Sequence, residues 1–220
     1  MRAALLFLAV TLGACSSDGT DAFGPLASGL RDQVMPQAPE APVVTRAAVE
    51  ASPFALIRVR MPEGGAAVMT PLADRGGVLT YMSANRKSLA VTGAAVTGSH
   101  GLGGDLLWMD LPARSPLRHA TPVQGWAGTE ARTYAHLGNN LAIARQRVTC
   151  QRRLGPAGSI EIVGRRHAVR RVDEQCAGGA LTFRNRYWVG PADGRVWRSE
   201  QWVSPLIGTL QIEVLKPFER

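Results

Sequence analysis

Apolar and polar side chains alternate along the last third of the chain, and this pattern restricts the fold more than any other feature. Positions 181, 183, 187 and 189 carry Leu, Phe, Tyr and Val, whereas positions 182, 184, 186 and 188 carry Thr, Arg, Arg and Trp. The pattern returns where Leu210, Ile212 and Val214 alternate with Gln211 and Glu213. A period of two is that of a β-strand with one buried and one solvated face. The C-terminal third therefore predicts an antiparallel sheet.

Earlier segments favour the same fold class. We expect strands or turns in the segments 55–61, 67–72 and 78–83 (a hairpin around 74–77), 89–91, 95–97, 106–111 (strand or helical turn), 132–150 (two strands around 138–140) and 195–203. Residues 112–128 are rich in Pro and Gly and predict a long connection. Because neither an internal repeat nor a long amphipathic helix interrupts this pattern, we expect a mainly β domain, an antiparallel β-sandwich or an open barrel.

One or two short helices are expected before the sheet. Thr45 is a typical N-cap residue for a short helix through Ala51, which Pro53 would stop. A single helical turn is also possible within 30–34. Residues 15–44 contain four prolines and no sustained periodicity, so we interpret them as a flexible tether before a domain at 45–220.

Residues 1–14 have the features of a lipoprotein signal peptide. Arg2 precedes an apolar stretch, 3–12, that is too short to span a bilayer. The sequence Leu-Gly-Ala-Cys at 12–15 resembles the lipobox of bacterial lipoproteins, in which the cysteine receives a diacylglycerol and its new amine is acylated. The alternative is a plain signal peptide with a chance cysteine. We expect lipidation at Cys15, and Ser16 after it implies the outer membrane, with the domain facing the periplasm.

The net charge of the chain has to be interpreted for a protein of the cell envelope. The full sequence has a net charge of +8, and removal of 1–14 takes away only Arg2. An exported protein does not meet cytosolic nucleic acid, so we expect no nucleic-acid partner. The basic charge then indicates either contact with polyanions of the envelope or simple solubility.

Cys150 and Cys176 are the cysteines that remain when Cys15 is lipidated. In an oxidising compartment two thiols most simply form a disulfide. By chain entropy alone, closing a loop of this length would stabilise the folded state by roughly 3.5 kcal/mol. A metal pair or a reactive thiol is the alternative, but the sequence has no CxxC motif and no histidine at ligand spacing. We expect no metal.

Arginine dominates the segment 145–171, in which Glu161 is the single acidic residue. Guanidinium groups bind carboxylates and phosphates in bidentate fashion, so an acidic polysaccharide or lipid phosphate is a possible ligand. A solvated basic face, with buried tryptophans nearby, is the alternative that we favour on general grounds. The candidate residues for binding a polyanion or glycan are Arg165, Arg166, Arg170, Arg171, Arg184, Arg186 and Trp188.

Catalytic motifs are missing from the sequence. It has no G-x-S-x-G elbow, and its four histidines are scattered without an HxH or HExxH motif. We therefore predict no catalytic residues and no cofactor other than the covalent lipid, although a site assembled in three dimensions would leave no such signature.

Four stretches resemble one family. They are LIRVR at 56–60, GLGGDLLWMD at 101–110, IEIVGRRHAVRRVDEQC at 160–176 and FRNRYWVGPADGRVWRSEQWVSPLIGTLQIEVLK at 183–216. With the lipobox they resemble the YjbF-type lipoproteins, which are related to the GfcB-type lipoproteins of group 4 capsule operons. The resemblance covers about residues 45–216.

The resemblance implies an outer-membrane lipoprotein that assists exopolysaccharide or capsule production or secretion without catalysis. Its operons also encode a porin-like β-barrel and a periplasmic protein, which are the implied partners. Two other functions stay open: a polysaccharide-modifying hydrolase or lyase, and a general envelope lipoprotein that contacts peptidoglycan or lipopolysaccharide.

Overall fold

The structure, a computed structural model, describes residues 43–137 and 142–219. The predicted signal peptide, Cys15, the helical turn within 30–34 and the 138–140 turn lie outside these residues. Among the helices in the described part, none combines the length and the hydrophobicity needed to cross a membrane.

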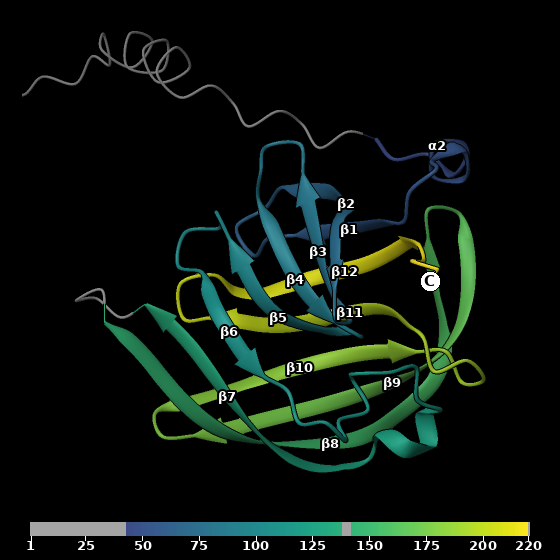
Figure 1. The fold of residues 1–220 in the computed structure, drawn as a ribbon. Helices are drawn as coiled ribbons and strands as arrows, with labels where there is room; N and C mark the ends of the chain where they lie inside the picture. The colour runs from purple at the N-terminus through teal and green to yellow at the C-terminus, as the bar shows by residue number, and fades with distance from the viewer. Residues whose placement is uncertain (1–42, 138–141, 220) are drawn as a thin grey trace, which may run out of the picture. The chain divides into compact units, whose positions relative to one another are not determined.

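Twelve antiparallel strands form one sheet in the described residues (Figure 1). The elements are α2 (Arg46–Ala51), β1 (Leu56–Arg60), β2 (Ala66–Arg75), β3 (Val78–Ser83), β4 (Ser88–Thr92), β5 (Ala95–His100), β6 (Leu106–Asp110), the 3-10 helix η1 (Val123–Trp126), β7 (Gly128–Leu137), β8 (Ile143–Ile162), β9 (Arg165–Gly178), β10 (Leu181–Val189), β11 (Val196–Ser204) and β12 (Gly208–Lys216). The strand order is β5-β4-β3-β2-β1-β12-β11-β10-β9-β8-β7-β6. The predicted mainly β fold is confirmed.

The two ends of this strand order, β5 and β6, lie beside each other, so the sheet is a nearly closed barrel. Side chains join them: the Ser99 hydroxyl donates to Asp105 Oδ1 (2.8 Å) and accepts from the amide of Leu106 (3.0 Å). The Asp105 carboxylate also accepts from the amides of Gly101 and Leu102, which shapes the loop between the strands. The open-barrel alternative therefore describes the fold well.

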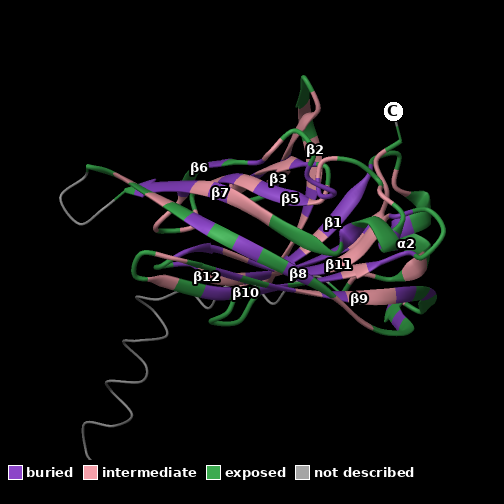
Figure 2. Cartoon of the chain, turned by 90° about the horizontal axis from the view of Figure 1, so that it is seen from below, coloured by how far each residue is buried: buried purple, intermediate pink, exposed green. Residues whose placement is uncertain are grey.

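Buried and exposed residues alternate along much of β8, β9 and β10 (Figure 2). In β10, Phe183, Tyr187 and Val189 are buried in the main core and Arg184 and Arg186 are exposed, as the alternation predicted. Helix α2 also begins as predicted, since Thr45 Oγ1 accepts a hydrogen bond from the amide of Ala48 (3.2 Å).

The connection after β6 closes part of one end of the barrel. Its Leu117, Val123 and Trp126 are buried in the main core. Gly93 and Gly194 touch this connection with φ angles of +60° and +66°, and a Cβ on them would stand 2.1 Å from Leu117 O and 2.3 Å from Thr121 O. Both contacts therefore need glycine.

The β8–β9 hairpin extends beyond the barrel, which the sequence did not predict. Its register shifts between Leu154 and Ala157, and the buried side of the hairpin changes there. The tip turns at Val163 and Gly164, both with positive φ. Beyond the shift the hairpin contributes to a second hydrophobic cluster, which consists of Val49, Leu56, Ile160, Ile162, Val169 and Leu215.

Candidate functional site

All seven residues predicted to bind a polyanion lie on β9 and β10, and we call them the outer arginine face. Arg165 and Arg166 lie at the tip of the β8–β9 hairpin, whereas Arg184 lies opposite Gln175 toward the other end of these strands. Arg170 is half-buried and donates from Nε to the carbonyl of Gly155 (3.0 Å), across the register shift. The structure thus brings the seven residues onto two neighbouring strands but not into one pocket. Because successive residues of a strand point to opposite sides of the sheet, Arg166 and Arg170 lie on the side opposite to the other five.

Acidic side chains neutralise part of the outer arginine face. Arg171 pairs with Asp173 (2.9 Å), and Arg186 lies 3.6 Å from Asp173 and 3.2 Å from Glu200. Asp173 lies two residues beyond the arginine-rich segment 145–171, and Glu200 lies on β11. Within the outer arginine face, Arg165, Arg166 and Arg184 are exposed and make no ion pair with a described residue, so they are the cations of this face that are available to a ligand.

The tryptophans near this face pack against the protein. The Trp188 ring lies 5.8 Å from the guanidinium of Arg198 and contacts the second hydrophobic cluster. Trp197 contacts the same cluster and packs against His167 in a tilted arrangement, at a centroid distance of 3.9 Å. Trp202 stacks on Phe183 against the main core. All three are half-buried, so packing accounts for most of their surface.

Cys150 and Cys176 form a disulfide, as predicted. They are direct cross-strand partners on β8 and β9, with their Cα atoms 4.0 Å apart. Their sulfur atoms and the Glu174 carboxylate lie within 4.8 Å of one another. Because each sulfur is bonded to the other, neither is a thiolate that could bind a metal there.

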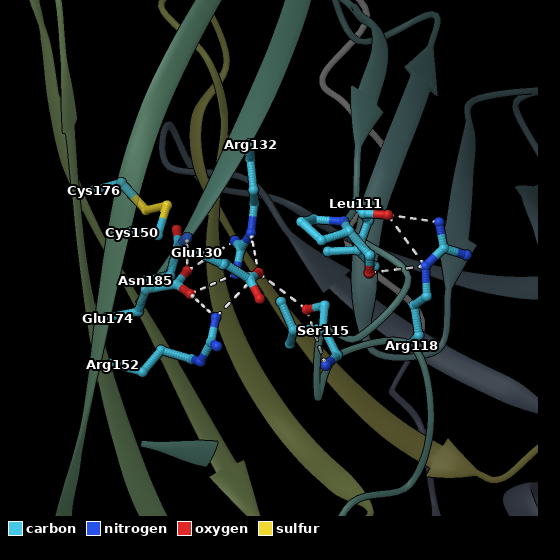
Figure 3. A network of polar contacts seen from close by, with 12 residues as sticks. Leu111, Ser115, Arg118, Glu130, Arg132, Cys150, Arg152, Glu174, Cys176 and Asn185 are labelled. Carbon is cyan, nitrogen blue, oxygen red and sulfur yellow. Dashed lines mark hydrogen bonds and ion pairs between the residues drawn. A yellow bond between two sulfur atoms is a disulfide. The ribbon is translucent and has the colours of Figure 1, made fainter. Parts of the chain in front are cut away.

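The barrel interior contains a buried ion network that the sequence did not predict (Figure 3). Arg132 donates to Glu174 Oε2 (3.0 Å) and to Glu130 Oε1 (2.6 Å). Arg152 lies 3.0 Å from Glu130 and 3.3 Å from Glu174. The network joins β7, β8 and β9 and pairs two arginines with two glutamates.

Neutral groups complete this network. Asn185 Nδ2 and the Tyr187 hydroxyl donate to Glu174 Oε2 (2.7 and 3.3 Å). Arg152 also donates to the carbonyl of Trp126 (2.8 Å), and the Ser115 hydroxyl donates to Glu130 (3.0 Å). The network therefore reaches β10 and the connection that closes part of one end of the barrel.

The pKa values in the network follow from burial and charge together. Burial alone would raise the pKa of Glu130, but Arg132 and Arg152 outweigh it and the pKa is lowered. Burial would lower the pKa of Arg132, yet Glu174 and the other partners hold it well above its usual value. Burial and Glu174 raise the pKa of Tyr187. At neutral pH Glu130 and Arg132 are therefore charged and Tyr187 is neutral, and each has its partners inside the network. This indicates a structural role.

A signal for this network is present in the sequence once the disulfide is assumed. Arg152 follows Cys150 by two residues and Glu174 precedes Cys176 by two, so a period of two places all four on the same side of the sheet. Arg152 belonged to the segment interpreted as a basic face. The structure corrects that interpretation, since Arg152 faces the interior and is 6% exposed.

Comparisons with known proteins agree with this fold. The model of a family described as group 4 capsule polysaccharide lipoprotein gfcB, YjbF matches residues 26–215. The crystal structure of the hypothetical lipoprotein YmcC from Escherichia coli (K12) superposes with a TM-score of 0.71. It is 16% identical, and the match covers 93% of this chain and 100% of that one, which shows a shared fold. No curated protein matches the sequence.

Proposed function

Because the chain belongs to the YjbF family of group 4 capsule polysaccharide lipoproteins, we propose that it is a non-enzymatic accessory factor in exopolysaccharide or capsule production and secretion. It acts at the outer membrane, held by lipid on Cys15, with its barrel in the periplasm. The observation that carries the proposal is the family match over 26–215, which includes nearly all of the barrel.

The lipid anchor supports this placement. A diacylated and N-acylated Cys15 would hold the protein stably, since two or more acyl chains are needed for lasting attachment. The lipobox at 12–15 and the family agree on this modification.

The outer arginine face supports contact with an anionic polymer. Arg165, Arg166 and Arg184 are exposed without an acidic partner among the described residues, and their guanidinium groups suit carboxylates or phosphates. Exposed charges of this kind bind a polyanion weakly and reversibly, and salt screens them. Weak and reversible binding suits a protein that transfers a polymer to another component of a secretion machinery. An outer-membrane β-barrel and a periplasmic protein of the secretion machinery are the proposed partners.

The test is the amount of surface exopolysaccharide in a clean deletion strain complemented with variants. Wild type should restore the polymer, and Cys15→Ser should fail to do so because the anchor is lost. Arg165→Gln/Arg166→Gln/Arg184→Gln should restore less polymer than wild type. The control, Arg60→Gln/Arg75→Gln/Arg114→Gln, changes the charge equally at three exposed arginines outside the outer arginine face and should complement fully.

Three outcomes separate the alternatives. Polymer of normal amount and length in the deletion strain would contradict the proposal and favour a general role in contact with peptidoglycan or lipopolysaccharide. Polymer of normal amount but altered length or substitution would favour a polysaccharide-modifying enzyme. Equal complementation by both triple variants would remove the outer arginine face from the proposal.

A further inference from the structure

The end of the barrel that the connection after β6 only partly closes holds a half-enclosed cleft of about 380 Å³, which we call the barrel-mouth cleft. Its walls are apolar and come from five strands. They include Ile57 of β1, Leu79 of β3, Val91 of β4, Val196 of β11, and Ile212 and Val214 of β12. The volume falls within the range of sites for small molecules, and such sites are mostly apolar with a few polar groups.

The deep end of the cleft offers little to a polar ligand. Gln201 donates to Ala94 O (2.9 Å) and to Ser199 Oγ (2.8 Å), and its Oε1 accepts from the amide of Val96 (3.0 Å). These polar atoms bind one another across the barrel. A ligand part that reaches them gains more from burying apolar surface than from new hydrogen bonds.

The rim of the cleft is cationic. Arg118 donates from Nε and Nη2 to Leu111 O (3.1 and 2.6 Å), as Figure 3 shows, and these carbonyl contacts fix the guanidinium without cancelling its charge. Arg195 lies 5.5 Å from the Trp197 ring and 3.9 Å from Asp193. With one acid for two arginines, and with His119 beside them, the rim is complementary to an anion.

We propose that the barrel-mouth cleft binds an anionic amphiphile, whose apolar chain lies between the strands and whose carboxylate or phosphate head lies between Arg118 and Arg195. The cleft would then be a lipid-binding site on a protein whose other charged surface faces a polymer. This goes beyond the function proposed above, which depends on the outer arginine face and the anchor.

Photolabelling tests the site in the full chain. Membranes that carry the protein are irradiated with a twelve-carbon fatty acid bearing a terminal diazirine, and labelled peptides are mapped by mass spectrometry. Label is expected on the peptides that contain Leu79, Val91 or Ile212. Dodecanoate and dodecyl phosphate are the competitors that distinguish a carboxylate from a phosphate head. At least one of them should compete tenfold better than dodecanol, the uncharged control.

Two variants locate the ligand. Val91→Trp fills the cleft and should reduce labelling at least tenfold, whereas Leu72→Trp adds the same side chain at an exposed position outside the cleft and should label as wild type. Arg195 follows the 191–193 turn, and its side chain is 38% exposed. Arg195→Gln should weaken competition by the anions while leaving that by dodecanol unchanged. Near-ultraviolet circular dichroism checks that each variant is folded.

Several results would overturn the proposal. One is label spread over outward-facing residues with none in the cleft. Another is equal labelling of Val91→Trp and Leu72→Trp. Equal competition by dodecanol and both anions would remove the charged head, and competition by glucuronate at the same concentration would indicate a sugar site instead.

Discussion

The buried ion network and the outer arginine face are built from the same residue types but differ in burial. In the network, Arg132 and Glu174 are 2% and 1% exposed, and two arginines meet two glutamates. On the outer face, the side chains of Arg186 and Asp173 are 48% and 41% exposed, and other arginines there have no acidic partner. Buried charges need complete compensation because water cannot solvate them, whereas exposed charges do not. The first region therefore supports the fold, and the second is free to meet a ligand.

The largest expected effect comes from breaking the network at its centre. Glu174→Gln leaves Arg132 and Arg152 with one carboxylate, and the loss of one member of a buried ion pair typically costs about 3–5 kcal/mol of unfolding free energy. Urea unfolding at pH 7 measures it. The control on the outer face is Glu200→Gln, which removes one of the two acidic partners of Arg186 and should cost about 0–1 kcal/mol. Equal losses in the two variants would refute the distinction between the regions.

The disulfide beside the network should contribute nearly as much. Replacing both cysteines, in Cys150→Ala/Cys176→Ala, should lower the unfolding free energy by about 3.5 kcal/mol or somewhat less, since a loop of this length is no longer closed in the unfolded chain. Wild-type protein unfolded in reductant should match the double variant. The oxidised protein, with Cys15 lipidated, should also react with no thiol reagent; a free thiol would contradict the pairing.

Local patterns predicted those parts of the fold that local physics determines. The alternation at 181–189 gave the faces of β10, and Thr45 with Pro53 gave the bounds of α2, because pleat geometry and capping depend on near neighbours. The disulfide followed from the cysteine count and the expectation of an oxidising compartment. Each of these inferences needed no knowledge of the distant chain.

The β8–β9 hairpin escaped prediction for a physical reason. Gly155 and Pro156 are residues that usually interrupt a strand, yet β8 continues through them by a shift of register. Its turn, Val163-Gly164, lacks the Asn-Gly or Asp-Gly signature. By alternation Glu213 points outward, but the tip of the hairpin covers the outer side of the sheet there. Glu213 is therefore only 3% exposed, and it pairs with Arg58 and Arg198. Which face is covered depends on tertiary contacts that periodicity does not contain.

Acid should weaken the network through Glu130. Its folded pKa is below the ordinary value of 4.5, so its stabilising effect is complete above that pH and is lost as pH falls through the folded pKa. Glu130→Gln should flatten the decline of unfolding free energy below about pH 4.5, measured by urea unfolding from pH 7 to pH 3. Glu63→Gln, at an exposed glutamate without an ion pair among the described residues, should leave the decline as in wild type. Identical profiles for both variants would contradict the role of Glu130.

The smallest effect on stability, and the clearest on binding, is expected for Asp173 on the outer face. Asp173→Asn releases Arg171 and Arg186, and the loss of such exposed pairs should change the unfolding free energy by no more than about 1 kcal/mol. The same change leaves Arg171 without an ion pair and Arg186 with Glu200 alone, so the protein should elute from a heparin column at higher salt than wild type. Asp110→Asn makes the same change of charge on β6, which two strands separate from β9. If both variants shift elution equally, net charge alone governs polyanion binding. A shift confined to Asp173→Asn locates the binding on β9 and β10, where the arginines are exposed to solvent.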